Sequence, residues 1–268
     1  MDPLFLSPAL PSTLIHYIIH HCTYPTTLII CSDRAEFLST LTQDVKAQQQ
    51  QQQQQYGTTT DPDTDTGPGH IGQAPRQPSS LPDHTASAPG LLAPPPLYQL
   101  AVTRHIRTVF IPTVSHLRAF LSVFTVQDNL IVSAPPATTS TAAPGSSSSG
   151  ANHRAHLLLV YGFLGLHRHT SEWSVQGVSG TAAVLVEAAK KAGLRAVIVE
   201  APAPSPPAET TDYRQHEAEI LSEKMPVLSG SSKRTGLDLE GTGWTAKTIE
   251  VSRVLGRWFR FQKGEWEA

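Results

Sequence analysis

The chain has 268 residues and a formal net charge of −2 at pH 7. This balance excludes a global electrostatic field that would hold the protein on nucleic acid or on a membrane. The 2 cysteines are too few for a disulfide scaffold and are typical of a reducing compartment. The longest apolar run, 157–166, is about half as long as a bilayer-spanning helix, so we expect an intracellular soluble protein.

Two segments lack the apolar content of a folded core. Residues 47–95 contain eight consecutive glutamines before a stretch rich in Thr, Asp, Pro, Gly and Ser, and residues 133–155 are rich in Ser, Thr and Pro. Such segments bury too little apolar surface to offset about 1–2 kcal/mol of backbone entropy per ordered residue. The sequence therefore predicts two disordered inserts in one domain that spans 1–268.

Strand and helix patterns alternate before the second insert. Ser12 stands where it would cap a short amphipathic helix. The β-rich run 26–31 predicts a strand, and the spacing of apolar residues predicts a helix over 34–45. A strand over 108–111 and a helix over 114–124 form the second unit.

The third unit has the strongest pattern. Residues 156–166 predict a buried strand, and Ser179 stands where it would cap a helix that ends at Gly193. Residues 196–200 predict the next strand. Unbroken apolar strands that alternate with helices are typical of a parallel sheet covered on both faces.

The last part of the chain has a different character. Residues 212–224 predict a polar helix, and the apolar residues 225–228 follow it. Residues 247–262 predict one or two antiparallel strands, with Gly256 as a bulge or a turn. Parallel units that end in antiparallel strands are common in mixed sheets.

The order of these parts resembles the RecA-like ATPase core of recombinases and their paralogues. The run 28–31 stands where a first strand leads into a phosphate loop, and 157–161 stands where a central strand ends in the second nucleotide motif. Residues 225–228, Trp244 and 248–261 are similar to the terminal strands of recombinase paralogues. The resemblance implies an α/β fold with a RecA-like, mainly parallel sheet flanked by helices and with antiparallel strands near the C-terminus.

Two parts that bind nucleotide in this family are missing. A phosphate loop needs glycines and a Lys followed by Ser or Thr, but residues 31–37 read Cys-Ser-Asp-Arg-Ala-Glu-Phe. The side chains of Asp33 and Glu36 would repel phosphate. The central strand ends in residues 160–163, which supply no carboxylate for a magnesium ion. We therefore expect no cofactor and no enzymatic activity.

A second resemblance keeps one enzymatic alternative open. Residues 161–165 followed by 177–180 resemble the oxyanion segment and the nucleophilic serine of an α/β hydrolase. The nucleophile elbow requires the pattern Gly-x-Ser-x-Gly. Here Ser179 is the central serine, but Thr181 stands where the second glycine of the motif should be, and the glycine comes one residue early, at Gly180. A helix cap is the favoured interpretation of Ser179, and a small α/β hydrolase remains an alternative.

Histidines and cysteines raise the question of a metal site. Zinc sites have close Cys/His pairs at defined spacings. The candidate ligands do not show two such pairs, so no metal is expected. These candidates are His20, His21, Cys22, Cys31, His167 and His169.

The C-terminal tail is the best candidate for DNA binding. Its candidate residues are Arg253, Arg257, Trp258, Arg260 and Lys263. Arginines pair with phosphates while aromatic faces stack on unpaired bases, as in proteins that bind single-stranded DNA. The alternative is an ordinary edge strand with solvated arginines and packed aromatic rings.

Within the family, a RecA-like domain that lacks the nucleotide-binding motifs resembles recombination-mediator subunits of the Shu type. The resemblance implies a non-catalytic, nuclear subunit that assists homologous recombination and DNA repair, with another RecA-like subunit and single-stranded DNA as partners. An Elongator-type accessory ring subunit that serves tRNA modification in the cytoplasm is the other alternative. No membrane partner is expected.

Overall fold

A computed structural model of the protein describes residues 2–57, 100, 103–125, 156–202, 213–228 and 247–264. A six-stranded, fully parallel sheet has the order β3-β2-β4-β5-β1-β8. Its strands are β1 (Leu4–Leu6), β2 (Thr23–Ile30), β3 (Ile106–Phe110), β4 (His156–Tyr161), β5 (Arg195–Val199) and β8 (Arg260–Gln262). A second, antiparallel sheet pairs β6 (Lys224–Pro226) with β7 (Thr248–Glu250). The predicted α/β class with a mainly parallel sheet and late antiparallel strands is confirmed.

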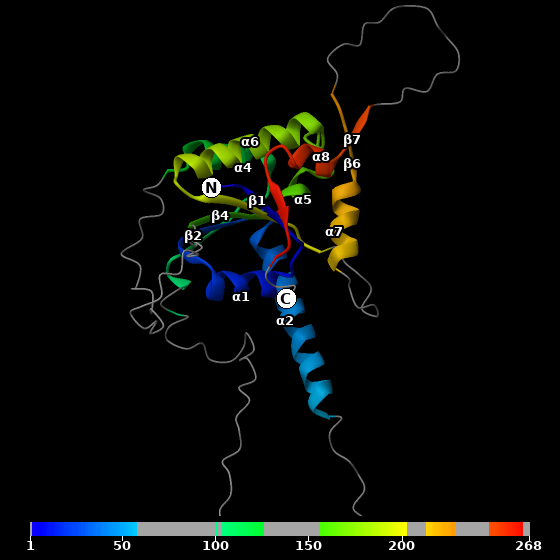
Figure 1. Ribbon diagram of the computed structural model, residues 1–268. Coiled ribbons are helices and arrows are strands. Elements are labelled where there is room, and N and C mark those ends of the chain that lie inside the picture. The colour runs from blue at the N-terminus through cyan, green and yellow to red at the C-terminus, as the bar shows by residue number, and fades with distance from the viewer. Residues whose placement is uncertain are drawn as a thin grey trace, which may run out of the picture.

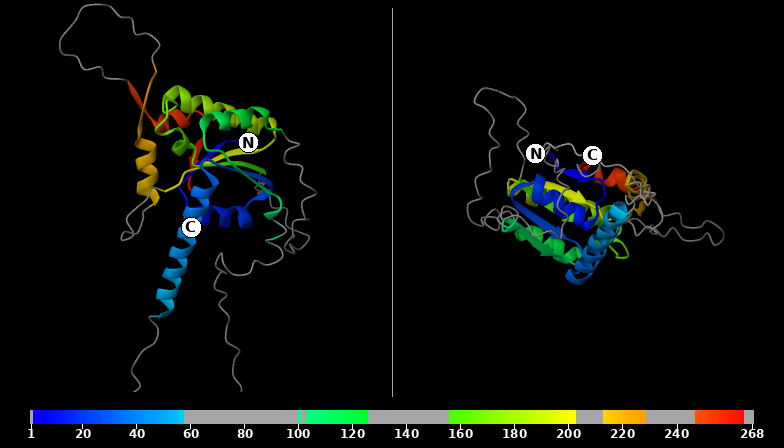
Figure 2. Two further views of the ribbon diagram at one scale, coloured as in Figure 1. Left: turned by 180° about the vertical axis from the view of Figure 1, so that it is seen from behind. Right: turned by 90° about the horizontal axis from the view of Figure 1, so that it is seen from below.

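Helices cover both faces of the large sheet (Figure 1; Figure 2). One face carries α1 (Pro11–His21) and α2 (Arg34–Gly57), and the other carries α4 (Val114–Val123), α5 (Phe163–His167), α6 (Val175–Lys191) and α8 (Val251–Leu255). Helix α7 (Tyr213–Ser222) lies against α8 and leads into β6. None of the helices in the described part of the chain is long and apolar enough to cross a bilayer.

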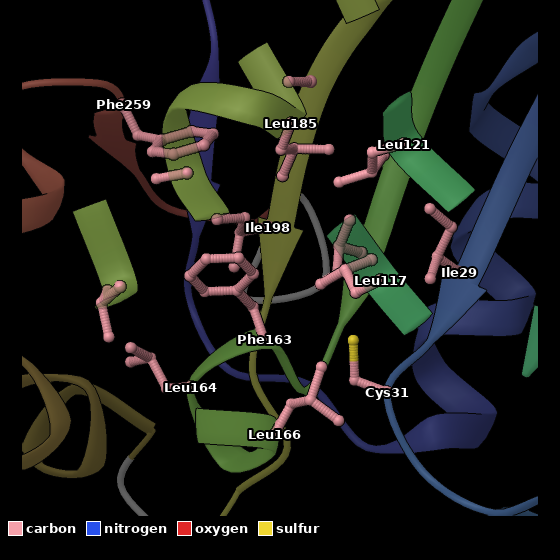
Figure 3. Packing of buried hydrophobic residues seen from close by; sticks show 14 of the residues in the cluster. Ile29, Cys31, Leu117, Leu121, Phe163, Leu164, Leu166, Leu185, Ile198 and Phe259 are labelled. Atoms are coloured by element: carbon pink, nitrogen blue, oxygen red, sulfur yellow. The ribbon is translucent and has the colours of Figure 1, made fainter. Parts of the chain in front are cut away.

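Alternate residues of the central strands enter two separate cores, as the period of a strand requires. In β4, Leu158 and Val160 belong to the core under α4, α5 and α6, while Leu159 and Tyr161 belong to the core over α1 and α2. Figure 3 shows the first core, where the ring of Phe163 packs between strand and helix side chains. Both cores hold the carboxyl ends of β2, β4 and β5 in fixed positions.

Three expected boundaries in the first two thirds of the chain are wrong. Helix α1 begins at Pro11 after Leu10, so Ser12 lies inside its first turn and is not the cap. The apolar run 156–166 is not one strand, because Gly162 has a φ of 79° and starts α5. Helix α6 is capped by the Ser174 side chain, which accepts a hydrogen bond from a backbone N–H, so Ser179 is an interior helical residue.

The expectations for the Gln-rich segment 47–95 and for the C-terminal segment 247–262 also need correction. Residues 47–57 of the expected Gln-rich insert are the last turns of α2, because glutamine is a good helix former. The rest of that insert, 58–95, and the whole of 133–155 lie outside the described residues. The segment 247–262 is not a pair of antiparallel strands: it contains β7, α8 and β8, and β8 pairs with β1 in parallel. Gly256, expected as a bulge or a turn, is the C-cap of α8 and begins the turn 256–258.

Candidate functional site

The candidate site lies at the carboxyl edge of the sheet, where its crossovers diverge. Strand β2 leads through α2 to β3, its neighbour on one side, and β4 leads through α6 to β5 on the other side. Open parallel sheets bind ligands in the crevice at such a point. Two adjoining cavities of about 470 and 550 Å³ occupy this edge and share Gly162, Gly165, Arg168 and Ala201.

A buried carboxylate occupies the N-terminus of α5 at this edge. Glu200 directly follows β5, and its side chain is 3% exposed. One of its oxygens accepts the backbone N–H of Leu164 at 2.7 Å, and the N–H of Gly165 also donates to this carboxylate. The N–H groups with which a helix N-terminus binds an anion are thus already used by the chain itself.

Burial sets the protonation of Glu200. Loss of water raises the pKa of this carboxyl to about 7, and the N–H of Leu164, the guanidinium of Arg168 and the N–H of Gly165 oppose that rise. The carboxyl of Glu223 adds to the rise. Arg168 is itself held by Glu223 at 2.7 Å, so its charge is shared between two carboxyl groups. The site therefore holds a carboxyl that titrates close to neutral pH.

A second carboxylate occupies the N-terminus of α1. The side chain of Asp44, on α2, accepts hydrogen bonds from the backbone N–H of Ser12 at 3.0 Å and from the Ser12 hydroxyl. The amide of Gln48, the first residue of the glutamine run, donates to the same Ser12 oxygen at 2.8 Å. Helices α1 and α5, which both begin at the carboxyl edge, therefore each have a side-chain carboxyl group at their N-terminus.

The loop between β1 and α1 has little hydrogen-bonding capacity left. The N–H groups of Ser7 and Ala9 donate to the carbonyls of Gln262 at 3.2 Å and Glu200 at 3.0 Å, and the hydroxyl of Tyr161 donates to the Ala9 carbonyl at 3.0 Å. Prolines at 8 and 11 have no N–H to offer. A phosphate-binding loop works through several convergent N–H groups, and this loop does not provide them.

The loop that follows β2 faces the cleft with acidic side chains. Asp33 and Glu36 line the cavity of about 470 Å³ together with Ser32, and both carboxylates are exposed. Cys31 at the start of this loop is buried, and burial together with the nearby Glu200 raises the pKa of its thiol well above the usual range. The thiol is therefore protonated and unreactive at neutral pH.

The structure does not bring together the cysteines and histidines that the sequence offered as possible metal ligands. Cys22 and Cys31 lie at opposite ends of β2. Both ring nitrogens of His167 have partners, because in the Nδ1-protonated form one donates to the Phe163 carbonyl at 2.8 Å and the other accepts from the Thr181 hydroxyl at 3.0 Å. Burial lowers the pKa of His167 and favours this neutral form. Within the described residues, no three His, Cys, Asp or Glu side chains form a metal-binding group.

Ser179 does not have the surroundings of a nucleophile. It lies on α6, away from any turn between a strand and a helix, and its hydroxyl accepts the indole N–H of Trp258 at 3.0 Å. A nucleophile elbow places its serine on a strained turn at the end of a strand. The geometry at Ser179 is that of a helix-packing contact.

The structure divides the candidate residues of the tail between two environments. Trp258 packs against the core under α6, and its neighbour Phe259 is buried. Arg253, Arg257, Arg260 and Lys263 are exposed, and Arg260 also pairs with Asp2 at 2.9 Å. The basic side chains remain accessible, whereas the indole of Trp258 is engaged inside the protein. DNA contact by these residues stays a prediction.

Sequence reasoning missed the two residues that define the carboxyl edge. Glu200 was expected only as the end of a strand, and Asp44 only as a polar helical residue. One signal in the sequence could have found Glu200, because it is an acidic residue directly after an apolar strand. The carboxyl end of a parallel strand lies close to helix N-termini, which favour a carboxylate. The contact between Asp44 and Ser12 bridges 32 positions, and no local pattern announces it.

Comparisons with known proteins add no relative. Neither protein-family models, nor curated proteins, nor solved structures give a match to this chain.

Proposed function

We propose that this protein is a non-catalytic, RecA-like subunit of a hetero-oligomeric complex that assists homologous recombination and DNA repair in the nucleus. The observation that supports it most is the occupation of the carboxyl edge by Asp44 and Glu200. These two side chains accept N–H groups of α1 and α5, so those groups are not available to an anionic ligand at this edge. A domain of this layout without a nucleotide site acts through the surfaces that it presents to other macromolecules.

The proposal is tested by purifying the tagged protein from its own cells and identifying by mass spectrometry what accompanies it. We expect a stoichiometric partner that carries a RecA-like domain, together with recombination proteins. Recovery of Elongator subunits would assign the protein to tRNA modification instead. Recovery of no stoichiometric partner would overturn the proposal that it is a subunit.

The contribution of the tail to DNA binding is tested on the purified complex. Replacing Arg253, Arg257 and Lys263 together by Ala removes three exposed cations without touching the core. If they contact phosphates, affinity for single-stranded DNA falls and the dependence of log Kd on log salt becomes shallower by about 2. Lys190→Ala with Lys191→Ala, on α6, is the control that removes two exposed cations elsewhere on the surface. An unchanged salt dependence in the tail variant would make these residues purely structural.

A further inference from the structure

The cleft at the carboxyl edge has the size and position of a binding site but the wrong charge for an anion. Its volume of about 470 Å³ lies within the range of small-ligand sites, and the adjoining cavity extends it across α5. Between them, the two cavities are lined by five carboxyl side chains, the guanidinium of Arg168 and the imidazole of His216, which lies 3.7 Å from Glu219. The carboxyl residues are Asp33, Glu36, Glu200, Glu219 and Glu223.

The single guanidinium does not offset this charge. Arg168 donates to Glu223 at 3.2 and 2.7 Å, so its charge is already compensated by one carboxylate. Asp33 and Glu36 form no ion pair within the described part of the chain. A concave surface with one sign of charge raises the local concentration of ligands of the opposite sign. The cleft therefore favours a cation.

The walls of the cleft suit a cation on an apolar stem. Pro11, Phe37, Tyr161 and Leu166 contribute apolar or aromatic surface next to the hydroxyls of Ser32 and Thr40. Lysine and arginine pack their methylene stems on apolar surface and keep their charged ends next to polar groups. Arginine also stacks on aromatic rings. A compact metal ion would leave these walls without a contact.

We propose that this cleft binds a lysine or arginine side chain that a partner polypeptide inserts at the carboxyl edge. The inference rests on the proposed function and deepens it, because it names the chemistry of the partner. The ammonium or guanidinium group pairs with Asp33 and Glu36, and the stem packs on Phe37 and Leu166.

Gly165, which lines both cavities, allows a test that changes no charge. A Cβ at Gly165 would meet nothing within 4 Å, and Gly165 lines both cavities. Gly165→Leu therefore fills the cleft without changing any charge. Gly180 on α6 also has open space around a Cβ and lines neither cavity, so Gly180→Leu is the matched control. Asp33→Asn with Glu36→Gln removes charge at two exposed positions and leaves the volume unchanged.

The experiment measures fluorescence anisotropy of labelled hexa-arginine with the purified full chain at about 0.15 M salt, with hexa-glutamate as the opposite charge. We expect the native protein to bind hexa-arginine saturably and not to bind hexa-glutamate. The affinity for hexa-arginine should be about tenfold lower in Gly165→Leu and also lower in the Asp33→Asn, Glu36→Gln variant. The affinity of Gly180→Leu should lie within about twofold of that of the native protein. Absence of saturable binding, or equal binding by Gly165→Leu and Gly180→Leu, would overturn the inference. If a partner still co-purifies after such a result, the proposed function stands and only this assignment of the cleft falls.

Discussion

Replacing Glu200 by Gln is expected to remove a pH dependence of stability worth up to about 3 kcal/mol. In the folded protein the pKa of this buried carboxyl is raised from 4.5 to about 7, so the folded state holds its proton more tightly than the unfolded state does. Its contribution to the free energy of unfolding is complete below about pH 4.5 and is lost as the pH rises through about 7. Glutamine keeps an oxygen for the N–H of Leu164 but does not titrate.

The measurement is urea unfolding of both proteins at several pH values between about 4 and 8. The quantity of interest is the difference between native protein and variant, because His167 titrates in both and its lowered pKa gives a slope of opposite sign. Relative to the native protein, Glu200→Gln should gain stability steadily as the pH rises. Parallel pH profiles would contradict the account of a buried, neutral-range carboxyl at the end of β5.

Gly177→Ala is expected to destabilise the protein by about 2–3 kcal/mol, although most Gly-to-Ala changes in helices stabilise. A Cβ at this position would lie 2.3 Å from the backbone carbonyl oxygen of Glu172. To relieve this overlap, the start of α6 must move away from the preceding turn. That movement would strain the cap from Ser174 and the contacts of Arg118 with Glu172 and the Gly177 carbonyl.

Gly180→Ala, on the next turn of the same helix, is the matched control, because a Cβ there meets nothing within 4 Å. It should raise the free energy of unfolding by up to about 1 kcal/mol. Equal stabilisation by both alanines would show that the close approach of Gly177 to Glu172 is not present in solution. The contrast also bears on function, since it explains Gly177 by packing rather than by membership of a nucleophile elbow.

Long apolar strands and amphipathic helices were predictable from the sequence, whereas short strands and alternative caps were not. Strands β2, β4 and β5 and helix α4 carry their own periodicity. Strands β1 and β8 have three residues each. Strand β1 pairs with β5 and with β8, and both partners lie far away in the sequence. In the run 156–166 an apolar strand and an apolar helix look alike, and the left-handed Gly162 decides where one ends.

For the candidate site, the sequence predicts only that a phosphate-loop motif is absent, and it does not predict which side chains meet there. The sequence of residues 31–37 shows that a phosphate loop motif is missing after β2, and the structure adds that side-chain carboxyl groups accept N–H groups at the starts of α1 and α5. That finding depends on contacts of Glu200 with Leu164 and of Asp44 with Ser12, which span 36 and 32 positions. Local propensity carries no information about such pairs.

Isothermal titration of the purified full chain with ATP in the presence of Mg²⁺ shows whether the protein binds a nucleotide. We expect no saturable binding at concentrations up to about 1 mM, because residues 31–37 supply no phosphate loop after β2 and because Asp44 and Glu200 accept the N–H groups of Ser12 and Leu164. Saturable binding with a Kd below about 100 µM would contradict it, and hydrolysis of the bound ATP would contradict the non-catalytic role as well.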